Sequence, residues 1–279
     1  MKSIALGQYY PSNSILHRLD ARIKVILAVL YIVCTFWCKE VFSFGALLLS
    51  AFLLILISRI PFRVVLRGIR PLVFIMCFTA ILNLFLTKGE GEPLWQVWRI
   101  AIYTDGIYNA VFMLIRIVVL VLATSLFLTY TTTPIALTDA LESLLKPLRL
   151  IRFPVHEFAM MMTIALRFIP LLSEETVKIM NAQKARGVDF SHGSLVQRAK
   201  ALIPILIPLF VSAFRRAEEL ATAMECRCYR GGTGRTKMTV PHLHVRDFVA
   251  LFLMLGFGAG IFCLVRYHAV VLSAVTSLW

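Results

Sequence analysis

Long apolar runs divide this sequence, and they constrain its fold more than any other feature does. They cover residues 25–38, 41–58, 72–86, 107–130 and 248–265. A helix needs ~20 mostly apolar residues to cross a bilayer, so the runs predict membrane spans. The first run is short and predicts a tilted or short span that is joined to the second by a tight turn at Lys39-Glu40.

Composition places the chain in the same class. Of its 279 residues, 59% are hydrophobic, only 16% are charged and 20 are Phe, which is more apolar surface than one soluble domain of this length can bury. The formal charge of +14 does not indicate nucleic-acid binding, because the cations lie between the apolar runs, where inner-leaflet phospholipids account for them. Residues 1–20 are polar and lack the apolar core of a removable signal peptide.

The positions of the cations predict how the spans are oriented. Basic residues precede the first run, separate the second from the third, and follow the fourth, whereas the alternate connections have no cationic excess. By the positive-inside rule, the N-terminus and the long polar segment then face the cytosol. Five spans would leave the C-terminus outside, with residues 269–279 too short to span on their own.

The fold class predicted is therefore an all-α integral membrane protein with about five transmembrane helices and a long cytosolic or interfacial segment between the fourth and the fifth. Four parts follow from this division. They are a cytosolic N-terminal segment 1–24, transmembrane helices 25–130, a cytosolic segment 131–246 and a C-terminal transmembrane helix 247–279.

The cytosolic segment should fold, because its acidic and basic residues are mixed along helical patterns. One amphipathic helix is expected from Pro134 to a stop at Pro147, and a second from Pro154 to Ala185. A third should follow Ser194 and run to Cys228. Its apolar part, residues 201–214, is interrupted by two prolines and predicts a helix that lies at the membrane surface or packs across its neighbours.

The last two of these helices each end in a tripeptide with a central arginine. The tripeptides are Ala185-Arg186-Gly187 and Cys226-Arg227-Cys228. A planar, permanently charged guanidinium at a helix C-terminus interacts favourably with the helix dipole and can bind carboxylates or carbonyls of a partner. A single arginine at a membrane interface is more often a solvated or lipid-facing cation. The shared position of these two at the ends of long helices is what a docking role would explain.

Several motifs in order resemble the transmembrane T component of energy-coupling factor (ECF) transporters. They are Gln8-Tyr9-Tyr10-Pro11, Ser14 to Lys24, Ala165-Leu166-Arg167-Phe168-Ile169-Pro170, Ala182 to Gly187, and Ala223 to Gly232. The resemblance implies a non-catalytic scaffold whose membrane helices hold a small substrate-binding S component. It also implies that each arginine motif docks one of two ATP-binding-cassette ATPases, and that ATP and Mg²⁺ are bound by those partners rather than by this chain. The imported substrate would be a vitamin or a metal ion, with a vitamin favoured.

The resemblance assigns two sets of residues. Docking on the ATPases falls to Ala185, Arg186, Gly187, Cys226, Arg227 and Cys228, and packing against the S component to Pro204, Pro208 and Phe210. The second tripeptide departs from the usual Ala-Arg-Gly pattern. Cys is small, so close approach survives, but Cys228 lacks the backbone freedom of Gly, which moves the expected helix stop to Gly231-Gly232.

Other polar residues carry weaker predictions. Arg116, inside the fourth run, is expected to be buried, paired or snorkelled, and Asn83 to make a hydrogen bond between helices. Cys226, Cys228, His242 and His244 superficially offer zinc ligands, but the Cys-x-Cys spacing is strained for one tetrahedral ion.

Two alternative functions remain open. The chain has no Gly-rich ATP-binding loop and no recurring pair of carboxylates or histidines on one helical face. An intramembrane transferase would need such pairs at the edges of its spans. The permease subunit of an ordinary ABC importer is a nearer alternative, but it would carry its own pore and a single short coupling loop.

Overall fold

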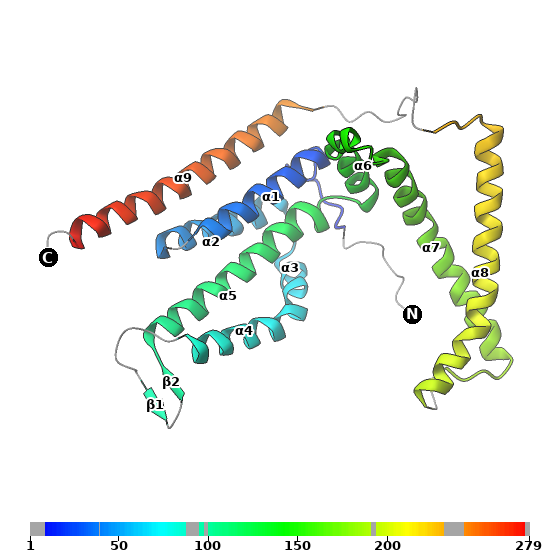
Figure 1. Ribbon diagram of the computed structural model, residues 1–279, viewed down its shortest axis with the longest axis horizontal. Helices are drawn as coiled ribbons and strands as arrows, with labels where there is room; N and C mark the ends of the chain where they lie inside the picture. Colours follow the sequence, from blue (N-terminus) through cyan, green and yellow to red (C-terminus); the bar gives the residue numbers. More distant parts are fainter. Residues whose placement is uncertain are drawn as a thin grey trace. The chain divides into compact units, whose positions relative to one another are not determined.

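The computed structural model describes residues 9–38, 40–87, 95–97, 100–190, 194–231 and 243–276. The elements in chain order are α1 (Ala21–Trp37), α2 (Val41–Ser58), α3 (Phe62–Ile69), η1 (Arg70–Leu72), α4 (Val73–Leu86), β1 (Trp95–Val97), β2 (Ile100–Ile102), α5 (Thr104–Thr124), η2 (Ser125–Tyr130), α6 (Pro134–Leu144), η3 (Lys146–Ile151), α7 (Val155–Ala185), α8 (Leu195–Cys226) and α9 (Val245–Thr276) (Figure 1). Within these residues the regular elements are helices apart from one short antiparallel hairpin, β1–β2, which was not predicted from the sequence. The chain forms two compact units, residues 7–140 with 241–279, and residues 1–6 with 141–240.

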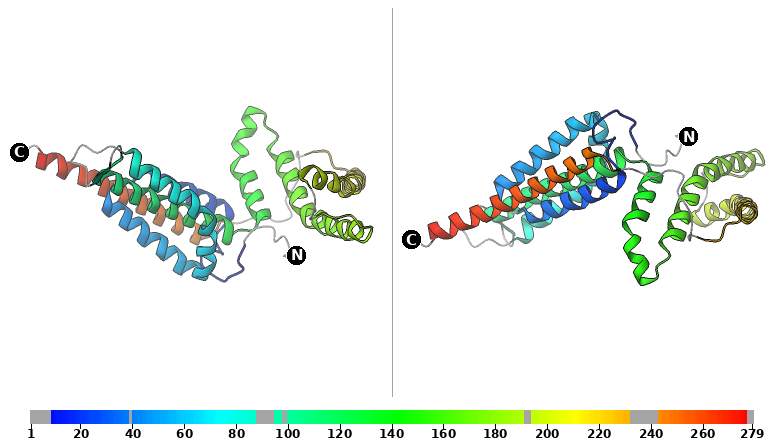
Figure 2. Two further views of the ribbon diagram at one scale, coloured as in Figure 1. Left: turned by 90° about the horizontal axis from the view of Figure 1, so that it is seen from below. Right: turned by 90° about the horizontal axis from the view of Figure 1, so that it is seen from above.

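The first unit is a bundle in which α1, α2, α5 and α9 run side by side and α4 packs on α5 (Figure 2). Its core contains Leu27 and Tyr31 of α1, Leu47 of α2 and Val119 of α5, none more than 3% exposed. The Tyr31 hydroxyl donates to the Leu47 carbonyl at 3.2 Å, so the one polar atom of the largest core side chain is satisfied within the bundle.

Most of the apolar surface outside this core is not covered by the chain itself. Phe42, Leu49, Phe52, Phe74 and Phe252 are each more than half exposed. Exposed aromatic and aliphatic side chains on nearly every helix are what a bundle solvated by lipid presents.

Six helical stretches of the described residues are long and apolar enough to cross a membrane. They are Val41–Ser58, Phe62–Phe85, Gly106–Tyr130, Val155–Ala185, Val196–Cys226 and Val245–Tyr267. Four of them match predicted spans and two are the long helices of the polar segment, while α1, with 17 residues, is one residue too short for that set. The helix α9 runs without a break from Val245 to Thr276, so residues 269–276 continue the last helix.

The helices α1 and α9 begin at the same place. Asp247, only 1% exposed, accepts hydrogen bonds from the backbone amides of Asp20 at 2.9 Å and His244 at 2.8 Å. The Asp20 side chain in turn caps α1 by accepting from the amide of Arg22, which is why this helix starts at Ala21 rather than at Val25 as predicted. The shared carboxylate fixes both N-terminal ends on one side of the bundle.

A second set of hydrogen bonds joins the N-terminal part of the chain to the end of η2, which is a π-helix. The Lys24 ammonium donates to the Thr131 carbonyl at 2.8 Å, and the amide of Tyr10 donates to the Tyr130 carbonyl at 3.0 Å. Tyr130 is 1% exposed, and its hydroxyl lies directly against the position that a side chain at Gly68 would take. Gly68 is therefore required for α3 to approach Tyr130 this closely.

The predictions for Arg116 and Asn83, the two polar residues singled out within the apolar runs, had different outcomes. Arg116 is half-buried and donates through Nη2 to the Cys38 carbonyl at 2.9 Å, as the prediction of a paired or buried arginine required. Asn83 was expected to bridge two helices, but its amide donates to the Thr79 carbonyl one turn earlier in α4. That part of the prediction was wrong, since a carbonyl of its own helix lies within reach.

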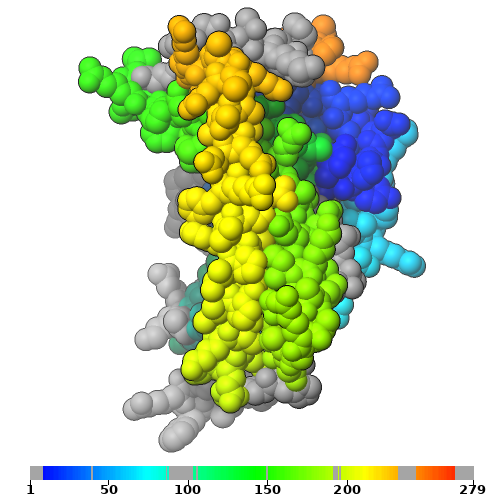
Figure 3. Space-filling view, turned by 90° about the vertical axis from the view of Figure 1, so that its right-hand side faces the viewer, coloured from blue at the N-terminus to red at the C-terminus, as the bar shows by residue number. Residues whose placement is uncertain are grey.

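The second unit consists mainly of α7 and α8, which pack along one another (Figure 3). They contain 31 and 32 residues, so each is about 47 Å long. Ser194 begins α8 with a capping box, in which its hydroxyl accepts from the amide of Gln197 and the Gln197 side chain accepts from the amide of Ser194. Pro170, Pro204 and Pro208 lie inside these helices without ending them. Before α7, α6 ends at Leu144, and the predicted stop, Pro147, falls in the following short helix η3.

Candidate functional site at the ends of α7 and α8

The helix α7 ends where the sequence predicted, in a turn that Gly187 makes possible. Arg186 is the C-cap residue and Gly187 follows with φ of +88°. The amide of Gly187 donates to the Lys184 carbonyl at 2.9 Å, and the amide of Val188 to the Gln183 carbonyl at 3.1 Å. These two bonds are those of a Schellman motif, which satisfies carbonyls that the helix end would leave unpaired.

The helix α8 ends in the same motif. Arg227 is its C-cap residue and Cys228 follows with φ of 56°. The amide of Cys228 donates to the Glu225 carbonyl at 2.8 Å, and the amide of Tyr229 to the Met224 carbonyl at 3.0 Å. The predicted stop at Gly231-Gly232 was therefore wrong: the helix ends at Cys226, and Cys228 adopts the left-handed conformation in spite of its side chain. Gly231 also has a positive φ, and Gly232 lies outside the described residues.

Arg186 and Arg227 thus occupy one position in two equivalent motifs. Both side chains are exposed, and no described carboxylate forms an ion pair with either. Each arginine is the C-cap residue of its helix, at the end where the helix dipole favours a cation. Two such ends can bind carboxylates or backbone carbonyls of a partner through several charge-assisted hydrogen bonds.

Polar side chains hold α7 and α8 together. Glu175 of α7 accepts from the Ser212 hydroxyl at 2.7 Å and from Nη2 of Arg216 at 3.0 Å, both on α8. Nε of Arg216 also faces the Ser212 hydroxyl at 3.4 Å. Sequence reasoning missed this cluster. Because Glu175 is separated from its partners by 37 and 41 residues, no local spacing indicates the contact.

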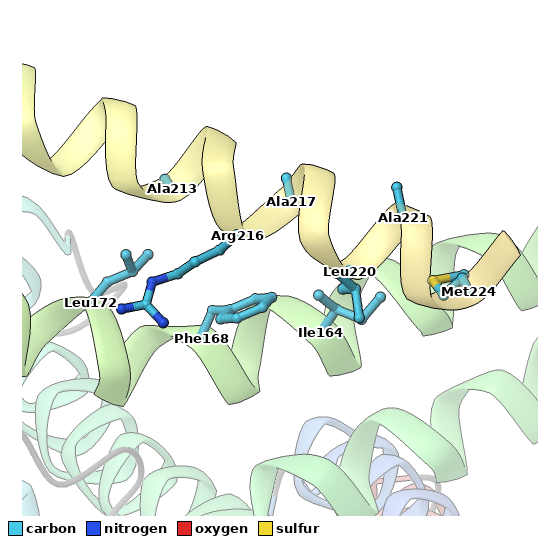
Figure 4. A pocket seen from close by; sticks show the side chains of 9 residues that line it. All are labelled: Ile164, Phe168, Leu172, Ala213, Arg216, Ala217, Leu220, Ala221 and Met224. Atoms are coloured by element: carbon cyan, nitrogen blue, oxygen red, sulfur yellow. The ribbon is translucent and has the colours of Figure 1, made fainter. Parts of the chain in front are cut away.

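Beside this cluster, α7 and α8 line an apolar groove with a volume of about 270 Å³ (Figure 4). Ala213, Ala217 and Ala221 recur every four residues on α8 and line the groove together with Ile164 and Phe168 of α7. Small side chains at that spacing allow two helix backbones to approach closely. Arg216 lies at one end of the groove and connects it to the polar cluster.

The predicted apolar part of α8 presents an uncovered face within its own unit. Leu206, Ile207, Phe210 and Phe214 are each 58–65% exposed, and the rings of Phe210 and Phe214 pack in a tilted arrangement with centroids 4.5 Å apart. Pro208 is also exposed and Pro204 is half-buried. The face is therefore ready to contact lipid or an apolar partner.

The structure describes three of the four residues that superficially offer zinc ligands. Cys226 and Cys228 are free and exposed, and His242 lies outside the described residues. In the part of the chain that the structure describes, no cluster of three or more His, Cys, Asp or Glu residues could hold a metal ion.

Comparison with known proteins shows the family. The family described as "Cobalt transport protein" (CbiQ) matches residues 12–238. The "Energy-coupling factor transporter transmembrane protein EcfT" of Clostridium kluyveri is 49% identical over 250 residues, which are 90% of this chain and 92% of the relative. The proteins of the same name from Bacillus subtilis and Streptococcus equi are 47% and 44% identical, over 85% and 95% of this chain and 89% and 97% of theirs.

This chain belongs to the EcfT family. The match to the family includes both arginine-bearing helix ends, the Glu175 cluster and the apolar face of α8. It also covers α1 to α5, whereas α9 lies beyond its last matched residue. The resemblance found in the motifs is thereby confirmed over most of the chain.

Proposed function

We propose that this chain is the scaffold and energy-coupling subunit of an ECF-type uptake transporter, and that Arg186 and Arg227 each dock one ABC-type ATPase. The observation that carries the proposal is the equivalence of the two helix ends, each with an exposed arginine as C-cap residue that pairs with no carboxylate among the described residues. Two equivalent ends suit two similar partner grooves. The neighbours Ala185, Gly187, Cys226 and Cys228 are small or lack a side chain, which allows close approach.

Transmission of force follows from the length and rigidity of the two helices. Each arginine lies at the end of a helix of more than thirty residues, and the two helices are clamped by Glu175, Ser212 and Arg216. A displacement of either end by an ATPase would move the whole pair. The partner ATPases would bind ATP and Mg²⁺, and this chain would have no catalytic role.

The exposed face of α8 supplies a surface for a membrane partner of the same transporter. We assign Pro204, Pro208 and Phe210 to the contact with a substrate-binding S component that carries a vitamin or another micronutrient. Large apolar side chains exposed along two turns of a helix support packing against another membrane protein. In this arrangement the N-terminus and the α7–α8 unit face the cytosol, which is the side of the ATPases.

Co-purification of the assembled transporter tests the docking role. Arg186→Ala and Arg227→Ala should each remove charge-assisted hydrogen bonds worth about 1.5–3 kcal/mol, which weakens ATPase binding by roughly tenfold to a hundredfold. The double variant should release both ATPases while the subunit is still inserted in the membrane. Arg198→Ala, at an exposed arginine in the first turn of α8, is the matched control and should retain them. Full ATPase yield with the double variant would contradict the proposal.

A further inference from the structure

A polar cavity lies among otherwise apolar membrane helices, at a place that the proposed docking role does not use. It has a volume of about 290 Å³ and is lined by residues of α2, α4 and α5. The lining residues are Phe44, Asn83, Asn109, Phe112, Met113 and Arg116. Half of them carry polar groups, which is unusual for a surface that faces lipid.

Arg116 lies at the edge of this cavity and contacts two neighbouring residues. Its Nη2 donates to the Cys38 carbonyl, and its guanidinium lies over the Phe44 ring, 5.4 Å from the centroid. Phe44 is itself buried and stacks on Phe112 at 4.9 Å. The Nε–H of Arg116 is buried and has no hydrogen-bond partner among the described residues. No described carboxylate forms an ion pair with this arginine.

The two asparagines add complementary groups. Asn83 uses its amide nitrogen on the Thr79 carbonyl, which leaves its oxygen as an acceptor. Asn109 is exposed on α5 and offers both a donor and an acceptor. The cavity therefore provides a cation, amide donors and amide acceptors together.

The position of the cavity along α5 places it near the boundary between the hydrocarbon layer and the lipid headgroups. The helix α5 continues into η2, and their 21 and 6 residues give a length of about 40 Å, against ~30 Å for the hydrocarbon layer. Asn109 lies about 8 Å from the start of α5 by the helix rise, close to the boundary of that layer. Arg116 lies two turns deeper, but helix side chains tilt toward the N-terminus and arginines extend toward the headgroups.

We infer that this cavity binds the headgroup of a phospholipid, with the phosphate on Arg116 and Asn109 and a headgroup hydroxyl or ammonium on the Asn83 oxygen. A carboxylate from a partner helix would satisfy the arginine but offers no donor for Asn83. The helices that line the cavity also carry exposed apolar side chains, among them Ile81 and Phe85 on α4 and Val111 on α5, which lipid acyl chains would cover.

Lipid titration of the purified full-length chain, followed by native mass spectrometry in an uncharged detergent, tests this site. The probes are phosphatidylglycerol and a diacylglycerol with the same chains but no phosphate. The wild-type protein should bind phosphatidylglycerol saturably and at least tenfold more tightly than diacylglycerol, as expected when charge-assisted hydrogen bonds are made. Arg116→Gln should abolish that preference, and Arg266→Gln, at an exposed arginine of α9, should leave it intact.

A second variant covers the case in which Arg116→Gln fails to fold. Asn109→Leu changes an exposed side chain without touching the bond from Arg116 to Cys38, and it should weaken phosphatidylglycerol binding several-fold. Equal binding of the two probes by the wild-type protein, or unchanged phosphatidylglycerol binding in both variants, would overturn the inference. If both variants kept the lipid but lost a membrane partner in the assembled transporter, the site would belong to a partner carboxylate and the inference would likewise be overturned.

Discussion

Cys228 behind α8 holds the same left-handed backbone position that Gly187 holds behind α7, with φ angles of 56° and 88°. The left-handed conformation is unfavourable by roughly 1–2 kcal/mol for a residue with a side chain, such as Cys228, but not for glycine. The repeated hydrogen bonds of the Schellman motif hold Cys228 there. The geometry at Arg227 thus follows from the position in the motif and does not depend on the glycine.

This relationship predicts opposite effects of two substitutions. Cys228→Gly should raise the free energy of unfolding by about 0.5–1 kcal/mol. It removes the backbone strain at this position, and the greater conformational freedom of glycine in the unfolded chain offsets part of that gain. Gly187→Cys should lower it by a similar amount. Thermal unfolding of the purified subunit measures both, with Cys226→Ala as a control inside the helix. A destabilising Cys228→Gly would show that the thiol makes a contact that outweighs the strain.

A second prediction concerns the contact of Gly68 with Tyr130. Gly68→Ala places a methyl group against the Tyr130 hydroxyl, and overpacking of this kind costs about 1–3 kcal/mol. Tyr130→Phe removes the obstructing oxygen, so the double variant should recover most of the lost stability. Gly45→Ala, where no atom lies within 4 Å of the added carbon, is the control and should not destabilise. No recovery in the double variant would place the clash elsewhere.

Arg216 and Glu175, in the polar cluster between α7 and α8, should stabilise the fold through a coupling free energy that an exposed ion pair lacks. In the contact of Arg216 with Glu175 the side chains are 35% and 25% exposed, whereas in the contact of Arg215 with Glu219 they are 81% and 66% exposed. Solvent screens the second pair far more strongly. A double-mutant cycle on unfolding should therefore give a clearly larger coupling for Arg216 and Glu175.

Charge reversal extends that test to transport. Glu175→Arg alone should impair uptake because it places two cations together, and adding Arg216→Glu should restore it at least in part. The same exchange between Arg215 and Glu219 should have little effect in either step. Equal coupling in the two pairs would mean that the contact of Arg216 with Glu175 does not hold the helices together.

The sequence predicted those parts of the fold that depend on local patterns. The long apolar runs, the start of α8 at Ser194 and the end of α7 at Gly187 are all local, since each rests on a periodic pattern, a cap or a glycine. The helix α1 began earlier than predicted because its cap, Asp20, is held by Asp247, which is 227 residues away. No neighbouring residue indicates that bond.

In the candidate site, too, the residues in local sequence patterns were predicted and those that depend on contacts between helices were missed. The two arginines were found because their tripeptides lie at the ends of helical patterns. Glu175 and Ser212 were missed because their partners are on the other helix, and the end of α8 was misplaced because residue preference was given more weight than the hydrogen bonds of the motif. The lining of the cavity at Arg116 also combines three helices, which no single stretch of sequence shows.

Thiol labelling tests the docking of the second helix end most directly, because Cys226 and Cys228 flank Arg227 and both are exposed. We expect a bulky maleimide to modify them in the free subunit and to be excluded once the ATPases are bound. Cys77 and Cys263, which are also exposed but lie in the membrane helices α4 and α9, serve as internal controls whose labelling should not change. Equal labelling of Cys226 and Cys228 with and without the ATPases would place this helix end outside the interface and contradict the account.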